Sequence, residues 1–170
     1  EVPVNKTKYY IHGEEYSREI TWLALLKTLL YRYTNQNTIT IGGMGFSQQP
    51  NDSIIALKTD FTKVSSFHQL MDYLTQSTSE ASERHEVPLK ELNQLNFEDA
   101  IPNFQVMFIH LEHELNHDDY LNQWTSNSEL CVFVYEKDNN NVIELDYQED
   151  LFEDKTIDQM LEHLFILIER

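Results

Sequence analysis

The chain has 170 residues, of which 41% are apolar and 12% aromatic, with only four Gly and four Pro. This composition predicts one packed domain over 1–170 and excludes a disordered, collagen-like or linker-like chain. The 29 acidic and 12 basic residues give a formal charge of −17, which opposes binding to nucleic acid or to an anionic membrane surface. A single cysteine and no apolar stretch of membrane-spanning length are typical of a cytoplasmic protein without disulfides.

The first half of the chain predicts one helix and two strands. Residues 1–16 show no helical period and are expected to form a short strand or a lead-in arm. The segment 18–34 repeats its apolar residues at helical spacing, which predicts a largely buried helix with Ser17 as its N-cap. A β-branched strand over 37–43 ends in glycines, and a second strand is expected over 53–61 after a loop.

A second helix, a short helical segment and a buried strand are expected next. Ser66 and Gln69 form a capping box that starts the helix, which 79–86 continues or frays. Pro88 then begins a short helical segment. The strand over 103–111 is almost entirely apolar, so we expect both of its faces to be covered.

The last third of the chain predicts a β-hairpin and a helix. The apolar segments 128–138 and 141–150 are joined by asparagines, which tolerate the positive φ of tight turns. A capping box of Thr156 and Gln159 is expected to start the final amphipathic helix. The order α-β-β-α-α-β-β-β-α indicates an α/β fold, with one mixed sheet covered by helices.

A short stretch in the chain matches the H-E-x-x-H pattern of zinc hydrolases, with His113, Glu114 and His117 in the required positions. Such an enzyme needs these side chains on a buried helix that lines a dry cleft. Here Asp118 and Asp119 follow directly, and a predicted strand precedes the motif. These flanks favour a solvated connecting segment, so the zinc hydrolase is a remote alternative.

No other catalytic pattern is present in the sequence. The chain has no adjacent His pair, and its "GGMG" stretch lacks the Lys of a phosphate-binding loop. Cys131 lies in the apolar run "LCVFVY", where a small buried hydrophobe is favoured over a nucleophile. The sequence therefore predicts no catalytic residue and no directly bound cofactor.

Four segments, taken in order, resemble the C-terminal half of a condensation domain from nonribosomal peptide synthetases. They are "TWLALLKTLLYRYTNQNTITIG", "HEVPLKEL", "IPNFQVMFIHLE" and "SELCVFVYEKDNNNVIELDYQEDLFEDKTIDQMLEHLFILIE". The resemblance covers nearly the whole chain and implies a single chloramphenicol-acetyltransferase-like lobe, one of two that form a V in the family. The residues that match family positions are expected to hold packing and turns; they are Pro88, Phe104, Gln105, Tyr147, Leu151 and Phe152.

The chain also departs from the family pattern. The family's catalytic motif, H-H-x-x-x-D-G, belongs to the N-terminal lobe and is absent from this sequence. The loop that follows the first strand has no Arg and is shortened, and the region before the first helix is abbreviated. The departures indicate a truncated or degenerate lobe.

The resemblance implies two functions. The favoured one is a non-catalytic lobe that serves as a structural platform or docking element in a nonribosomal peptide or hybrid peptide–polyketide synthetase, beside neighbouring synthetase domains or a carrier protein. The alternative is the acceptor-side half of an active condensation domain, which would receive the phosphopantetheine arm of a carrier. A lobe alone must also cover the apolar surface that two lobes share, by polar substitution, a neighbouring domain or a homo-oligomer.

Carrier proteins of these systems are commonly acidic, so binding to this acidic chain would need a local basic patch. The first candidates are Lys58, Lys63 and Arg84. A second group consists of Arg18, Lys27 and Arg32.

Overall fold

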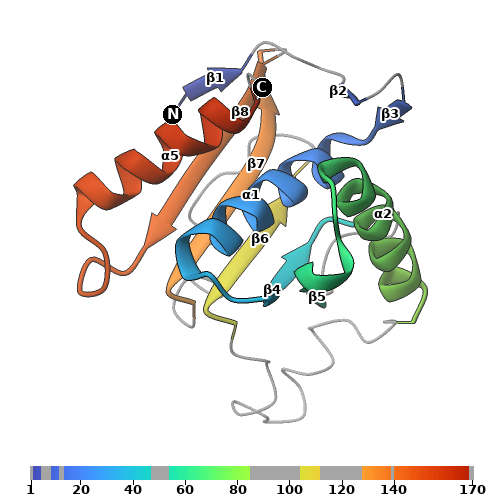
Figure 1. The fold of residues 1–170 in the computed structure, drawn as a ribbon. Helices are drawn as coiled ribbons and strands as arrows, with labels where there is room; N and C mark the ends of the chain where they lie inside the picture. The colour runs from blue at the N-terminus through green and yellow to red at the C-terminus, as the bar shows by residue number, and fades with distance from the viewer. Residues whose placement is uncertain are drawn as a thin grey trace, which may run out of the picture.

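The structure is a computed structural model, and it is built around one mixed sheet with helices on one face (Figure 1). It describes residues 2–4, 9–11, 14–46, 54–84, 104–111, 128–138 and 140–168. The elements are β1 (Val2–Val4), β2 (Tyr9–Ile11), β3 (Glu14–Tyr16), α1 (Arg18–Thr34), β4 (Thr38–Met44), β5 (Ile55–Asp60), the 3₁₀ helix η1 (Phe61–Lys63), α2 (Phe67–Arg84), β6 (Val106–His110), β7 (Leu130–Lys137), β8 (Asn140–Tyr147) and α5 (Asp154–Ile168).

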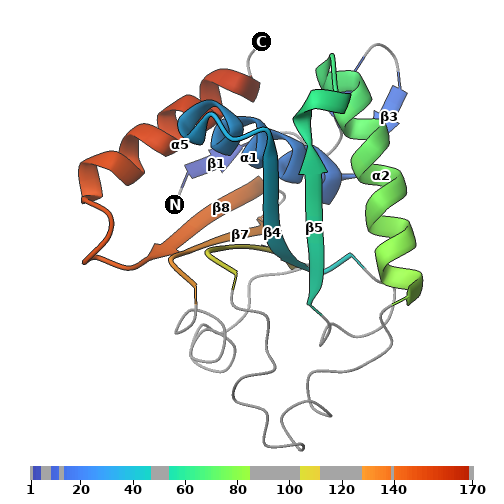
Figure 2. The ribbon, with the colours of Figure 1, turned by 60° about the horizontal axis from the view of Figure 1, so that its bottom comes forward.

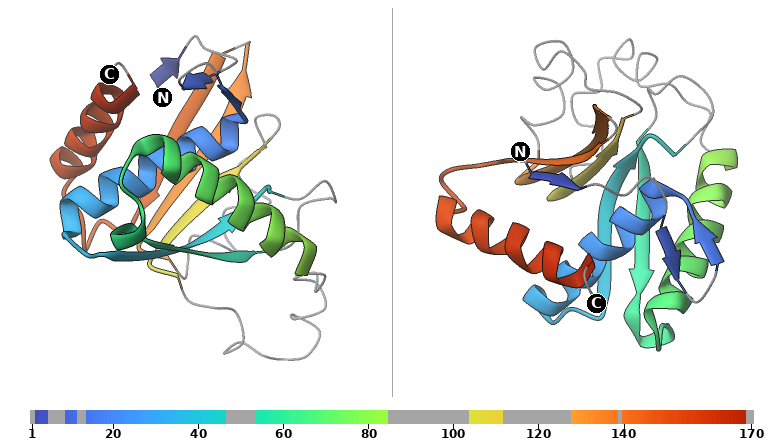
Figure 3. Two further views of the ribbon diagram at one scale, coloured as in Figure 1. Left: turned by 45° about the vertical axis from the view of Figure 1, so that its right-hand side comes forward. Right: turned by 90° about the horizontal axis from the view of Figure 1, so that it is seen from above.

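The six-stranded sheet has the order β1-β8-β7-β6-β4-β5, and β2 and β3 form a separate pair. The central strands β4, β6 and β7 are parallel, whereas β5, β8 and β1 are antiparallel to their neighbours. Helices α1, α2 and α5 lie on the same face of this sheet (Figure 3). The predicted α/β fold with a mixed sheet covered by helices is confirmed.

Helix α1 forms the centre of the main core. Ten of its residues are buried, because its apolar side chains repeat at helical spacing on more than one face. Trp22 and Leu23 are among the largest fully buried side chains of the described residues. Helix α1 packs against α2, α5 and β4.

Both ends of α1 follow backbone rules, and of the two capping residues only the N-cap was predicted. Ser17 is the N-cap, as expected, although its side chain makes no capping hydrogen bond. At the C-cap, Asn35 has a φ of 52° and its N–H donates to the carbonyl of Tyr31. Asn is one of the few residues that tolerate this left-handed conformation.

The starts of the other two long helices correct the sequence prediction. Helix α5 begins at Asp154 rather than after Thr156, whose N–H donates to the carbonyl of Glu153. At α2, the N–H of Gln69 donates to Ser66 Oγ as predicted, but the Gln69 side chain accepts from Ser65. The predicted helical segment that starts at Pro88 lies outside the described residues.

Strand β5 is one edge of the sheet, and α2 lies beside it (Figure 2). The hydroxyl of Tyr73 on α2 donates to the carbonyl of Lys58 at 3.0 Å. Strand β4 pairs with β6 only over its last three residues, Gly42 to Met44. The preceding half, 38–41, pairs only with 57–60 of β5; we call these two segments the β4–β5 ribbon.

No helix in the described part of the chain is long and apolar enough to cross a membrane.

Candidate functional site

The H-E-x-x-H stretch, with His113, Glu114 and His117, lies outside the described residues. Within the described ranges, no group of three or more His, Cys, Asp or Glu side chains is arranged to hold a metal ion. The zinc hydrolase therefore stays a remote alternative from sequence.

Two of the predicted docking residues lie together at the edge of the sheet. Lys58 is exposed on β5, and Lys63 is exposed on η1, which follows β5 directly. Lys63 Nζ lies 3.8 Å from Asp60 Oδ2. Hydrogen bonds from Thr62 lower the pKa of the Asp60 carboxyl, and the charges of Lys63 and Lys58 lower it further. The charges of both lysines therefore lie near Asp60, on one region of the surface.

Lys27 and Arg18, from the second group of basic candidates, are not available for docking. Lys27 is fully buried and Arg18 forms an ion pair with Glu136 on β7. The helical pattern of α1 would have shown that Lys27 falls among buried positions. The prediction treated its charge as evidence of exposure, and that was wrong.

Arg32 belongs to the end of α1 that contacts η1, although 26 positions separate it from Lys58 in the sequence. The ring of Tyr31 stacks on Phe61 of η1 with centroids 4.5 Å apart, and exposed Arg32 follows Tyr31 directly. The structure thus combines members of the two predicted groups. We call Arg32, Lys58 and Lys63 the basic corner. Arg84 ends α2, and its side chain lies outside the described set.

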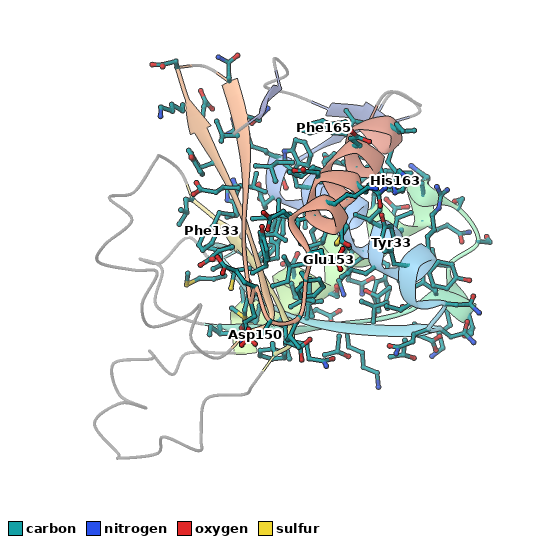
Figure 4. All side chains as sticks on the ribbon, turned by 90° about the vertical axis from the view of Figure 1, so that its left-hand side faces the viewer. Tyr33, Phe133, Asp150, Glu153, His163 and Phe165 are labelled. Carbon is teal, nitrogen blue, oxygen red and sulfur yellow. The ribbon has the colours of Figure 1, made fainter. Side chains whose placement is uncertain are left out.

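Acidic residues gather on α5 and on the turn before it, from which Figure 4 labels Asp150 and Glu153. The exposed ones are Glu149, Asp150, Glu153, Asp154, Asp158 and Glu162. Lys155 is exposed among them. The charge distribution is therefore uneven, with negative charge concentrated along this helix and its preceding turn.

Helices α1 and α5 are linked near the end of α1 by a polar aromatic pair (Figure 4). Tyr33 Oη lies 2.7 Å from His163 Nδ1, and the two rings meet edge to face. Loss of water around the hydroxyl raises the pKa of Tyr33. This pair fastens two helices on the surface and does not form part of a cleft.

The "GGMG" stretch serves packing. A Cβ at Gly42 would lie 2.2 Å from Met107 Sδ, and one at Gly43 would lie 2.3 Å from Leu57 Cδ1. Gly45 has a φ of 89°, and a Cβ there would lie 2.1 Å from the carbonyl oxygen of His110. The glycines are thus explained by close approach of neighbouring strands, without a phosphate.

The sheet face opposite the helices carries a second apolar cluster of buried side chains. Its members are Met44, Met107, Ile109, Cys131, Phe133, Tyr135 and Val142. Tyr135 Oη donates to Glu144 Oε2 at 3.1 Å. These side chains are buried, so the cluster is a second packed core and not an open apolar surface. Burial, together with the charge of Asp146, raises the pKa of the Cys131 thiol to about 12. That thiol is a packed side chain and not a nucleophile.

Several residues that match family positions support turns. The carbonyl of Gln105 accepts from the N–H groups of Glu129 and Leu130. The rings of Tyr147 and Phe152 meet edge to face, and the N–H of Phe152 donates to the carbonyl of Gln148. Their structural role agrees with the prediction.

Sequence reasoning missed one polar cluster. Tyr16 Oη donates to Asp72 Oδ1 at 2.8 Å and lies 3.0 Å from His68 Nδ1. His68 Nε2 lies 3.6 Å from Asp72 Oδ2. The only signal was the i, i+4 spacing of His68 and Asp72 on one helix, because Tyr16 is more than 50 residues away. The cluster ties the start of α2 to the end of β3.

No protein-family model matches the chain. Among curated proteins, it is similar to linear gramicidin synthase subunits D and C of Brevibacillus parabrevis, with 31% and 29% identity over 174 residues. These matches cover 88% of this chain but only 3% and 2% of the relatives' length.

Solved structures with the same fold come from condensation-type domains. The EpoB cyclization-docking bidomain from Sorangium cellulosum aligns with a TM-score of 0.70 at 18% identity, covering 93% of this chain and 37% of that one. The starter condensation domain of rhizomide synthetase aligns with a TM-score of 0.65 at 12% identity, covering 89% and 40%. The chain is thus similar in sequence to segments of linear gramicidin synthase subunits, and its fold is one lobe of the chloramphenicol-acetyltransferase-like fold of condensation-type domains.

Proposed function

We propose that the chain is a non-catalytic condensation-like lobe that serves as a structural platform or docking element in a nonribosomal peptide or hybrid synthetase. The observation that carries this proposal is the absence of any adjacent His pair, and hence of H-H-x-x-x-D-G, from all 170 residues. Fold without a site does not confer activity. The assembly line would make an antibiotic or similar natural product in the cytoplasm.

The direct test of the non-catalytic role is an assay for amide formation. Two carrier proteins, each loaded with an aminoacyl group on its phosphopantetheine arm, are mixed with the purified chain, and the product is measured by mass spectrometry. We expect no product above the rate without protein. Product formation by the chain alone would overturn the proposal.

The basic corner is the surface that we propose for an acidic carrier protein. It supplies three exposed cations, Arg32, Lys58 and Lys63, whereas the other predicted cations are buried, paired or outside the described set. Attraction at short range would then outweigh repulsion from the overall charge, which salt screens beyond ~8–10 Å. The chain would bind no cofactor of its own, and phosphopantetheine would come only with the carrier.

Charge reversal tests the docking surface. The variant with Arg32→Glu and Lys63→Glu should bind a purified carrier protein at least about tenfold more weakly than the unaltered chain, by calorimetry at fixed salt. The matched comparison is the single variant Lys63→Glu against Lys155→Glu, because each reverses one exposed cation and the second lies on α5. Equal weakening by the control would show a bulk-charge effect and contradict a local site. Higher ionic strength should also weaken binding to the unaltered chain.

The alternative function is the acceptor-side half of an active condensation enzyme, with its catalytic lobe elsewhere in the polypeptide or in a partner. The partial coverage of the solved structures favours it, because the chain spans only 37% and 40% of the two condensation-type chains compared above. Adding a separately purified lobe that carries H-H-x-x-x-D-G to the assay distinguishes the two functions. Product that appears only with both lobes would support the alternative, as would a stable complex of the two. A homo-oligomer would instead appear as a concentration-dependent mass in sedimentation.

A further inference from the structure

Lys27 is an unusual residue for the centre of a hydrophobic core. It lies midway along α1 and is fully buried among apolar side chains such as Leu23 and Leu26. Its Nζ donates to the carbonyl of Ile39 at 3.2 Å and to that of Leu57 at 2.8 Å. One amine therefore connects α1 to both strands of the β4–β5 ribbon.

No described carboxylate neutralises this amine. Strand β4 has no ionisable side chain, and Lys58 and Asp60 of β5 alternate onto the opposite face of the sheet from Leu57. On α2, His68 and Asp72 form contacts with each other and with Tyr16. The acidic residues of α5 are exposed. Burial without a counterion lowers the pKa of Lys27 to about 7.

The ribbon is attached to the rest of the domain through the helices. Its strands, 38–41 and 57–60, pair with each other and not with β6, which meets β4 only from Gly42 onward. A two-stranded ribbon is marginally stable alone. It is held by its buried side chains, by the hydrogen bond from Tyr73 of α2 to the carbonyl of Lys58, and by the two hydrogen bonds of Lys27.

We propose that Lys27 is a proton-sensitive anchor for the β4–β5 ribbon, so that proton uptake by its amine favours local opening of the ribbon away from α1. An open ribbon exposes the amine to water, where it is fully protonated, whereas the closed state holds the amine without a counterion. Lower pH therefore shifts the balance toward the open state. This inference concerns the lobe itself and does not depend on carrier docking.

Hydrogen exchange on the full chain tests the proposal between about pH 7.5 and about pH 9. After correction for intrinsic exchange rates, the protection of ribbon amides should fall about tenfold for each unit by which the pH is lowered, because opening takes up one proton. Amides of β7 and β8 serve as the internal reference for global unfolding, which also frees Lys27 and therefore follows the same pH dependence. Because the ribbon opens locally, its protection should stay below that of β7 and β8 at every pH and should not change in low urea, whereas theirs should fall. Ribbon protection that equals the reference and falls with it in urea would overturn the proposal.

The variant Lys27→Met removes the amine that takes up the proton while keeping a long unbranched side chain. After correction for intrinsic exchange rates, its ribbon protection should be independent of pH, and Lys27→Gln should behave likewise. A ribbon slope that persists in either folded variant would also overturn the proposal. If neither variant folds, the comparison of ribbon and reference in the unaltered chain decides alone.

Discussion

Gly45→Ala is the substitution whose cost follows most directly from the structure. Gly45 has a φ of 89°, and the new Cβ would lie 2.1 Å from the backbone oxygen of His110, where ordinary contact begins at 3.4 Å. The left-handed backbone costs about 1–2 kcal/mol, and displacement of a β6 carbonyl adds about 1–3 kcal/mol. The smaller entropy of the unfolded chain offsets less than about 1 kcal/mol. We expect a net loss of about 3 kcal/mol.

Urea unfolding measures this loss, and for a chain of this size a thermal scan should show a midpoint lower by roughly 6–12 °C. Gly42→Ala is the matched control, because its added Cβ meets flexible groups, the Met107 sulfur and the Phe104 ring. Those side chains can move, so we expect about 1 kcal/mol. A Gly45→Ala loss no larger than that of Gly42→Ala would refute the reasoning from backbone contact.

Three further changes have defined outcomes. Burial lowers the pKa of Lys27 from its ordinary value of 10.5 to about 7, so the unfolded chain holds one more proton between these values and stability rises with pH. Urea unfolding should therefore show the stability advantage of Lys27→Met over the unaltered chain shrinking by roughly 2 kcal/mol from about pH 8 to about pH 9.5. A constant difference would contradict the buried amine as its cause. A double-mutant cycle of Arg18→Met and Glu136→Gln, measured by urea unfolding, should give a coupling free energy of about 1 kcal/mol. The coupling should decrease with salt, because these side chains are 18% and 30% exposed. Zero coupling would mean that the ion pair is not formed. Cys131, whose burial raises its pKa to about 12, should resist iodoacetamide at neutral pH until urea unfolds the chain, as read by mass spectrometry.

The elements with strong periodicity could be predicted from the sequence. Helix α1 was expected over 18–34 and is found there, because caps and apolar spacing are local properties. The predicted cap of α5 was wrong, because the helix begins before Thr156, where Tyr147 Oη donates to Asp154 at 2.8 Å, a contact that the capping pattern does not include. Contacts between segments distant in sequence, such as that of Tyr16 with Asp72, leave no local signal.

The candidate site shows the same limit. Lys58 and Lys63 are close in sequence and could be grouped from it. Arg32 is connected to η1 only through its neighbour Tyr31, whose ring stacks on Phe61. Lys27 was treated as a surface cation although its helical position is among buried residues. Charge alone does not tell a docking residue from a buried one.

The hydroxyl of Tyr73 has a consequence for aggregation. Exposed edge strands are templates onto which a strand of another molecule can add, which is a hazard while long polypeptides are being synthesised and folded. At the β5 edge, Tyr73 occupies the carbonyl of Lys58, and the charge of that lysine disfavours a second strand. The Tyr73 hydroxyl and the Lys58 ammonium thus protect the β5 edge from edge-to-edge polymerisation. Tyr73→Phe removes the first of these two groups while leaving the aromatic ring in place.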